Sequence, residues 1–284
     1  MLSLRTNTAT ISAVNAADRA GHAAAVAQTR LSTGYRVNSA QDDAAGLQIA
    51  TRLKAQSSGM AVAMRNVQNG ISLMQTVGGV VKNIISLFSR MHDLAIQAAD
   101  GSSSMQDKLA LQSEFSAQYD EVWNQLSTQY AGEDLFISQA PQFHAKLWHP
   151  FNFQIGEASS DTMTVDLLPV LGQTPLSLKW GTTELQTVLT QNANQTIDDT
   201  AQAIDLWSAV GSAVGAVSNQ LEHVYSNLSS QSANTQVAAG RILDTDYATE
   251  TASATSEQML QQASTAMLKS SNSVVGLALS LVSQ

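Results

Sequence analysis

The chain has 284 residues, a formal net charge of -9 and a pI near 4.9, and only 13% of its residues are charged and 5% aromatic. Few aromatic residues are available to build a large globular core, and no cluster of Lys and Arg along the chain predicts a surface for nucleic acid. The absence of cysteine excludes disulfides, thiolate nucleophiles and Cys-ligated zinc.

The N-terminal stretch MLSLRTNTATISAV contains no charged segment followed by an apolar core of about 7 to 15 residues, so we expect no cleavable general-secretion signal. The longest apolar run, 274–282, is interrupted by Gly276 and Ser280 and is too short to span a bilayer. These features predict no membrane partner and export by another route.

The first thirty residues are predicted to form a helix that places small residues on its contact face. Leu4, Ile11, Val14 and Leu31 stand there among many alanines. Because short isolated helices depend on packing for stability, this helix needs a partner.

Two adjacent carboxylates, Asp42 and Asp43, precede the strongest helical pattern of the chain. Neighbouring carboxylates can share a cation or divide acid and base roles. Asp is also a preferred residue at helix starts, where it accepts hydrogen bonds from unpaired N–H groups. We favour a capping role at the start of the helix.

A single helix is predicted from about residue 46 to residue 99, because apolar residues recur at alternating steps of four and three, as in a coiled coil. One stripe consists of Met60, Met64, Val67, Ile71, Met74, Gly78, Val81, Ile85, Phe88, His92 and Ala95, and a second of Leu73, Val77, Val80, Ile84, Leu87, Met91, Leu94 and Ala98. Two stripes require more than one packing partner. The turn-forming residues 100–104 then lead into a shorter antiparallel helix marked by Leu111, Phe115, Val122 and Leu126.

The middle of the chain changes character, since FNFQIGEASSDTMTVDLLPV alternates apolar and polar residues around a Gly/Ser/Asp-rich interruption and predicts two short strands. Helical spacing returns from about Ile197. A last stripe comprises Leu260, Ala263, Met267, Ser270, Val274, Leu277 and Leu281. The fold class expected is mainly α, a long antiparallel helical coiled-coil rod formed by both chain ends with a small β-hairpin region in the middle.

Three stretches of the chain resemble bacterial flagellin. RLSTGYRVNSAQDDAAGLQIATRL (30–53) is similar to its N-terminal signature, whereas RILDTDYATE (241–250) and MLQQASTAMLKSSN (259–272) are similar to its C-terminal one. The resemblance implies a short flagellin without the variable outer domains, and thus a secreted structural subunit that self-assembles into the extracellular flagellar filament for motility. The alternative is a flagellin-like hook-filament junction protein.

The resemblance also implies a domain organisation. Residues 1–45 and 241–284 would form an inner terminal coiled coil with a connecting spoke, and residues 46–240 a helical domain with a β region at about 131–196. Asp42 and Asp43 would lie at the helix start as caps or contacts between subunits. The predicted assembly interface comprises Met60, Met64, Val67, Ile71, Ile84, Met91, Leu260, Met267, Val274 and Leu281.

Partners follow from the resemblance as well: other copies of the chain, the flagellar export apparatus, an export chaperone, and cap and hook-junction proteins. In many flagellins a host Toll-like receptor reads the long helix and its hairpin partner, and the matching positions are Arg90, Leu94 and Glu114. Ser89 and His92 depart from the usual Gln and Arg. The alternative to receptor recognition is that Leu94 is simply part of the apolar stripe and that Arg90 and Glu114 are solvated charges on the helix surface.

No catalytic set is evident. His144 and His149 are five residues apart and could contribute metal ligands if carboxylates converged on them, but no HExxH motif and no GxxxxGK phosphate loop occurs. We therefore expect no enzyme activity, no metal and no cofactor. Polar surface roles are the simpler interpretation of these histidines.

Overall fold

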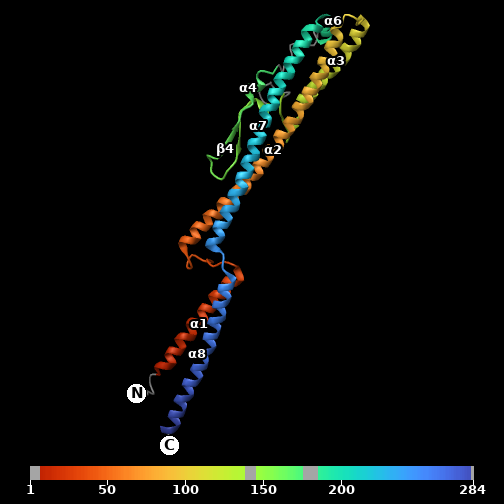
Figure 1. Cartoon of the computed structure of the whole chain (residues 1–284). Helices are drawn as coiled ribbons and strands as arrows, with labels where there is room; N and C mark the ends of the chain where they lie inside the picture. The colour runs from red at the N-terminus through yellow and green to blue at the C-terminus, as the bar shows by residue number, and fades with distance from the viewer. Residues whose placement is uncertain (1–6, 138–144, 175–184, 283–284) are drawn as a thin grey trace. The chain divides into compact units, whose positions relative to one another are not determined.

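The computed structural model describes residues 7–137, 145–174 and 185–282 (Figure 1). The chain divides into two compact units: unit 1 comprises Met1–Ser57 and Ala233–Gln284, and unit 2 comprises Ser58–Ser232. Unit 1 thus joins the two ends of the chain, and unit 2 is built from the middle.

In unit 1, helix α1 (Thr8–Thr33) packs antiparallel on helix α8 (Tyr247–Val282). Thr10 at the start of α1 lies 2.9 Å from Ser271 near the end of α8, whereas Arg30 pairs with Glu250 near its beginning. The sequence defines both ends of α1. The Asn7 side chain accepts a hydrogen bond from the Thr10 N–H, and Gly34 ends the helix in the left-handed conformation at φ 75°.

The two segments that leave these helices are bound to each other. Tyr35 and Asp244 form an antiparallel bridge, the Arg36 N–H donates to the Leu243 carbonyl at 2.6 Å, and the Thr245 N–H donates to the Gly34 carbonyl at 3.0 Å. A small apolar cluster of Val37, Ala50 and Leu243 lies beside them. The connecting segments are therefore ordered parts of unit 1.

Two long helices, α2 (Ala44–Ala99) and α7 (Ala193–Leu243), continue from unit 1 into unit 2. Within unit 2 they lie side by side and antiparallel: a Cβ at Gly78 would contact Val214, and His92 Nδ1 lies 3.0 Å from the Thr200 hydroxyl. Helix α3 (Met105–Leu126) folds back on α2, as the turn at 100–104 predicts. Ser104 and Asp107 cap its start reciprocally.

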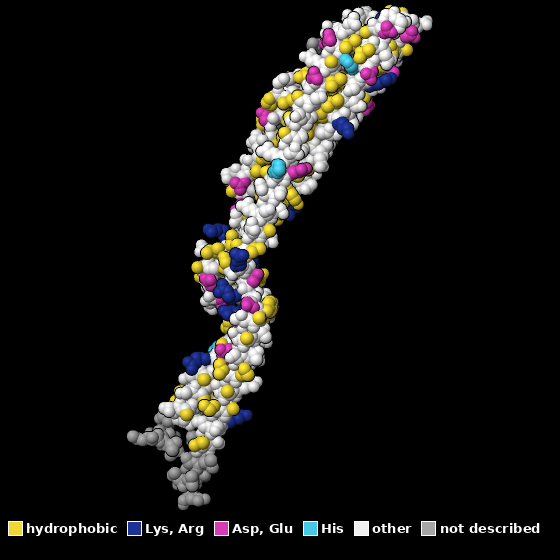
Figure 2. Space-filling view, in the orientation of Figure 1, with side chains coloured by type: hydrophobic (Ala, Val, Ile, Leu, Met, Phe, Trp, Pro, Cys, Tyr) yellow, Lys and Arg dark blue, Asp and Glu magenta, His cyan; other side chains and the backbone are white. Residues whose placement is uncertain are grey.

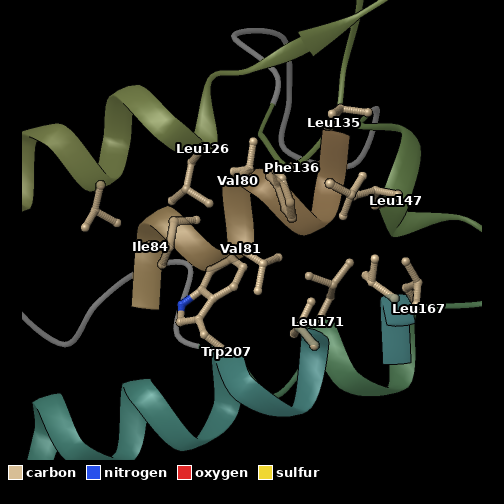
Figure 3. Close-up of a cluster of buried hydrophobic side chains, with 14 of the residues drawn as sticks. Val80, Val81, Ile84, Leu126, Leu135, Phe136, Leu147, Leu167, Leu171 and Trp207 are labelled. Atoms are coloured by element: carbon tan, nitrogen blue, oxygen red, sulfur yellow. The ribbon is translucent and has the colours of Figure 1, made fainter. Parts of the chain in front are cut away.

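The core of unit 2 is continuous and contains large side chains (Figure 3). The side chain of Trp207, which is 1% exposed, meets the ring of Phe136 edge to face with 5.8 Å between centroids. The residues labelled in the figure are Val80, Val81, Ile84, Leu126, Leu135, Phe136, Leu147, Leu167, Leu171 and Trp207. Side chains from α2, α7 and the irregular middle segment thus meet in one core.

The predicted hairpin is present: β3 (Phe151–Gln154) pairs antiparallel with β4 (Thr162–Val165), with Phe151 opposite Val165. It packs on α2, where Gly70 leaves room for the Phe153 ring and the Asn66 side chain donates to the Gln154 carbonyl at 3.4 Å. A second, shorter pair joins β1 (Gln129–Tyr130) to β2 (Glu133–Asp134).

Three short helical turns in the middle region are not predicted by the periodicity: η1 (Lys146–Trp148), α4 (Leu168–Leu171) and α6 (Val188–Gln191). Tertiary contacts hold them. The buried Gln112 side chain of α3 donates to the Leu185 carbonyl at 2.5 Å and accepts from the Leu189 N–H at 2.7 Å, which attaches α6 to α3. The predicted mainly helical fold with a central strand pair is confirmed.

By length and composition alone, α2 could cross a membrane, but 44% of its most apolar window is already buried inside the chain. Core helices of water-soluble proteins share this property, so the composition of α2 is weak evidence for a membrane span.

Candidate assembly surface

The terminal helices of unit 1 meet through small and polar side chains. Partly or fully buried positions recur at steps of three and four along α1 and of three, four or seven along α8. On α1 this line includes Thr10, Ala13, Ala17, Ala20, Ala24, Ala27 and Leu31, and on α8 it consists of Glu250, Ala254, Glu257, Ser264, Leu268 and Ser271. Sequence reasoning did not identify this contact line on α8, because its Glu and Ser residues carry little apolar signal. The 3.5-residue spacing was the signal that could have revealed it.

Apart from Leu31 and Leu268, large apolar side chains of the same helices point away from this contact line. On α8, Leu260, Met267 and Val274 are 53%, 66% and 51% exposed. On α1, Ile11 and Val26 are 51% and 45% exposed. The apolar stripe predicted on the C-terminal helix is thus left uncovered by the chain itself, and side chains that would ordinarily face a core face outward. The side chain of Leu281, the last predicted interface residue, lies outside the described residues.

The predicted interface residues on α2 have a different place. Met60, Val67, Ile71, Ile84 and Met91 are at most 7% exposed, and Met64 packs against the same core. Their contacts are made within unit 2, so this part of the predicted interface is corrected to intramolecular core. Helical periodicity identifies a buried face, but it does not tell whether the chain or a neighbour covers it.

The adjacent carboxylates before α2 have two separate roles. Asp43 accepts the Gly46 N–H at 2.8 Å and caps α2. Asp42 instead holds the preceding turn, since it accepts the N–H groups of Asn38 and Ser39 and the Ser39 hydroxyl. The Ser39 N–H is the largest cause that keeps the pKa of Asp42 below its ordinary value, because it stabilises the charged carboxylate.

The three residues matched to receptor recognition do not share one exposed surface. Arg90 and Glu114 form an ion pair between α2 and α3 with 2.6 Å between Nη2 and Oε1, and both side chains are exposed to solvent. Leu94, by contrast, is 0% exposed. Direct contact of a partner with Leu94 is therefore excluded while unit 2 is folded.

No group of three or more His, Asp or Glu side chains that could hold a metal occurs among the described residues. His144 lies outside these residues, whereas His149 follows the η1 turn. His92 Nδ1 forms a partly buried hydrogen bond with the Thr200 hydroxyl, 3.0 Å away.

Comparisons with known proteins agree with this geometry. The model of the bacterial flagellin N-terminal helical region matches residues 4–140, and that of the C-terminal helical region matches residues 195–281. A flagellin of Halalkalibacterium halodurans is 34% identical over 248 residues, covering 87% of each chain. Flagellin A of Vibrio cholerae is 30% identical and covers 89% of this chain and 92% of its own. That second alignment spans 351 positions, more than the 284 residues of this chain, so the relative has additional internal residues.

Among solved structures, a flagellar hook-associated protein from Vibrio parahaemolyticus has a TM-score of 0.55 at 16% identity, covering 72% of this chain and all of that one. At this identity the similarity concerns the fold alone. The hook-junction alternative is therefore not favoured over the flagellins, to which the chain is similar along most of its length.

Proposed function

Because this chain belongs to the bacterial flagellin family and is a structural, non-enzymatic subunit of the extracellular flagellar filament, we propose that it polymerises through the apolar stripe of unit 1. We define this stripe as Ile11, Val14 and Val26 on α1 with Leu260, Met267 and Val274 on α8. The observation that supports the proposal is the inverted arrangement of these two helices, which keep mainly small and polar residues between them and turn most of their large apolar residues outward.

Energetic considerations favour other copies of the chain as the groups that bury the exposed apolar side chains of unit 1. Ordering a residue costs roughly 1 to 2 kcal/mol of backbone entropy, whereas burial returns about 25 cal/mol per Å² of apolar surface. The α1–α8 contact line is dominated by Ala and Ser, which contribute little apolar area. Contacts with other copies would supply the area that a single chain lacks, so folding of the ends and polymerisation would be coupled.

The test is to compare the protein before and after polymerisation. Concentrated protein should form long homopolymers by electron microscopy, and helical circular dichroism should increase as it does so. Limited proteolysis of the monomer should remove the chain ends and leave a fragment that retains unit 2. Protease-resistant ends in the monomer would contradict the coupling, and absence of homopolymers would contradict polymerisation itself.

We further propose secretion through the flagellar export apparatus, with an export chaperone bound to α8 and with cap and hook-junction proteins at the filament ends. Family membership supports these partners. The exposed Leu260, Met267 and Val274 also give a chaperone an apolar surface to cover before polymerisation. Loss of chaperone binding on replacing these three residues by Ser would support the last point.

A host Toll-like receptor is the remaining proposed partner, with Arg90 and Glu114 as its contacts and Leu94 as a packing residue beneath them. The exposed ion pair supports this restricted role. Replacing Arg90 and Glu114 by Ala should reduce monomer signalling in receptor-bearing cells. Unchanged signalling would contradict the proposal.

A further inference from the structure

The sulfur atoms of this chain belong to methionine alone, because the chain has no cysteine. Thiolates, which ordinarily compete for oxidants, are therefore absent. Five of the nine methionines lie in or against the core of unit 2: Met60, Met64, Met74, Met91 and Met163. Three others, Met105, Met259 and Met267, are 63%, 61% and 66% exposed, whereas Met1 lies outside the described residues.

Met267 on α8 is the most exposed large apolar side chain among the described residues. On a helix the nearest side chains lie three and four residues away. At Met267 these neighbours are Ala263, Ser264, Ser270 and Ser271. All four side chains are too short to cover a thioether, so the sulfur of Met267 is accessible to a small oxidant in solution.

Met267 also belongs to the apolar stripe of unit 1. Leu260 and Val274 lie seven residues before and after it, close to two helical turns, so the three residues share one side of α8. Figure 2 shows apolar side chains, in yellow, at the surface of the terminal helices. Met259 is eight residues from Met267 and points about 80° away from it around the helix, and Met105 is on α3 in unit 2. Two equally exposed methionines thus lie outside the stripe.

A methionine thioether reacts with a peroxide in a two-electron step. The sulfur attacks one oxygen of hydrogen peroxide, an S–O bond forms and the O–O bond breaks. The sulfur loses two electrons, and the second oxygen leaves as water with both peroxide protons. The product is a sulfoxide, a polar group that loses its hydration if an apolar contact buries it without a hydrogen-bond donor. Oxidation therefore opposes a contact that the thioether favours.

We infer that Met267 is a reversible oxidation site that controls polymerisation, with hydrogen peroxide as the oxidant. The inference rests on the proposed polymerisation through the apolar stripe. In the single chain the thioether is open to peroxide, whereas in a polymer a neighbouring copy would cover it, so the unpolymerised chain is the form that reacts. Methionine sulfoxide reductases reverse the step with a dithiol as electron donor, which yields thioether, disulfide and water.

The first test compares oxidation rates within one chain. Protein is treated with hydrogen peroxide and digested, and the sulfoxide at each methionine is quantified by mass spectrometry. In the monomer, Met267 should be oxidised about tenfold or more faster than Met74 and Met91, which are 0% exposed. In filaments the rate at Met267 should fall about tenfold or more. Equal rates at Met267 and Met91 in the monomer, or at Met267 in monomer and filament, would overturn the inference.

The second test measures the effect of oxidation on polymerisation. The peroxide dose is one that leaves thermal unfolding of unit 2 unchanged, so that the core methionines stay reduced. The critical concentration of each protein after treatment is divided by its own value before treatment. This ratio should be about ten or more for the parent chain, because the sulfoxide of Met267 disfavours the contact.

Three variants locate the sulfur atom that is responsible. In Met267→Leu the same ratio should fall below about two, since no sulfur remains in the stripe. Met105→Leu and Met259→Leu each remove an equally exposed sulfur from outside the stripe and should keep the ratio of the parent chain. A high ratio in Met267→Leu, or a low one in either control, would overturn the inference.

The third test reverses the oxidation. Treated parent protein incubated with dithiothreitol and both types of reductase, one for each sulfoxide epimer, should recover its original critical concentration. Because the chain has no cysteine, the dithiol has no disulfide to reduce in it. Polymerisation that stays impaired after the sulfoxide is removed would overturn the inference. Failure of the untreated protein to polymerise would instead refute the proposed function.

Discussion

Units 1 and 2 are built from helices with the same spacing of apolar residues, but only unit 2 covers its own apolar side chains. In unit 2, Phe88, Phe115 and Trp207 are at most 1% exposed. Among the described residues of unit 1, the buried apolar side chains are Ala20, Ala27, Val37, Ala50, Ala239 and Leu243. Unit 2 therefore has the core of an independently stable fold, whereas unit 1 has a surface that neighbours can complete.

This difference indicates that unit 2 determines the stability of the single chain and that unit 1 determines polymerisation. A core of large side chains stabilises unit 2 before polymerisation, so that its folding does not depend on protein concentration. If other copies complete unit 1, as proposed, its stability should depend on protein concentration. Substitutions in the two units should then separate folding from polymerisation.

The largest effect is expected from Met267→Asp in unit 1. Met267 is 66% exposed in the single chain, so the charge is solvated in the monomer and thermal unfolding of unit 2 should not change. In a polymer contact the same charge would be buried without a partner, and filaments should not form by electron microscopy. Met267→Leu preserves apolar volume and should polymerise. Normal filaments from the Asp variant would contradict the role of the apolar stripe.

The next largest effect is expected from Trp207→Ala in unit 2. Trp207 is 1% exposed and packs against Phe136, so its truncation should destabilise unit 2 by about 3 to 5 kcal/mol in denaturant unfolding. The matched truncation in unit 1, Leu260→Ala, should change monomer unfolding by less than about 0.5 kcal/mol because Leu260 is 53% exposed. Similar costs at the two sites would refute the contrast between the units.

A smaller effect is expected at Gly70, where α2 contacts the β3–β4 hairpin. A Cβ there would lie 3.0 Å from Phe153 Cε1 and 3.3 Å from Leu221 Cδ1. Gly70→Ala should destabilise unit 2 by about 1 to 3 kcal/mol through overpacking, despite the better helix propensity of Ala. Gly79→Ala is the control, since a Cβ there meets nothing within 4 Å. It should leave stability unchanged or raise it.

The smallest effect concerns the cap of α8. The Thr249 hydroxyl, followed by the N–H groups of Ala248 and Thr249, holds the pKa of Asp246 below its ordinary value of 3.8. A carboxyl whose pKa is lowered by folding stabilises the folded state fully above the ordinary value, and this contribution is lost as pH falls through the lower, folded-state pKa.

Consequently the melting temperature of filaments should not respond to Asp246 between pH 5 and pH 8 and should respond only in more acidic solution. Asp246→Asn retains an acceptor and should lose this acid response with little change at neutral pH. Asp246→Ala should lower the melting temperature slightly at neutral pH as well. An Asn variant with the same acid response as the parent protein would show that other carboxylates cause it.

Several local features of this protein could be predicted from its sequence. The spacing of four and three predicts α2 from about residue 46 and the structure begins it at Ala44, and alternation predicts the strands β3 and β4. The flagellin family is confirmed, as is the absence of an enzyme function. These features depend on residues close together in the chain, whose own propensities and spacing dictate helix, strand or cap.

Only the tertiary structure decided which surface each helix covers. Apolar stripes on α2 and α8 have the same spacing, yet Met91 is buried by the chain itself and Met267 is exposed. Likewise, Gln236 and Ser57 are 179 positions apart, and only the antiparallel register of α2 and α7 brings their side chains within 3.1 Å of each other. Periodicity defines the direction in which a side chain points, whereas the group that covers it is supplied by distant residues whose pairing depends on the whole fold.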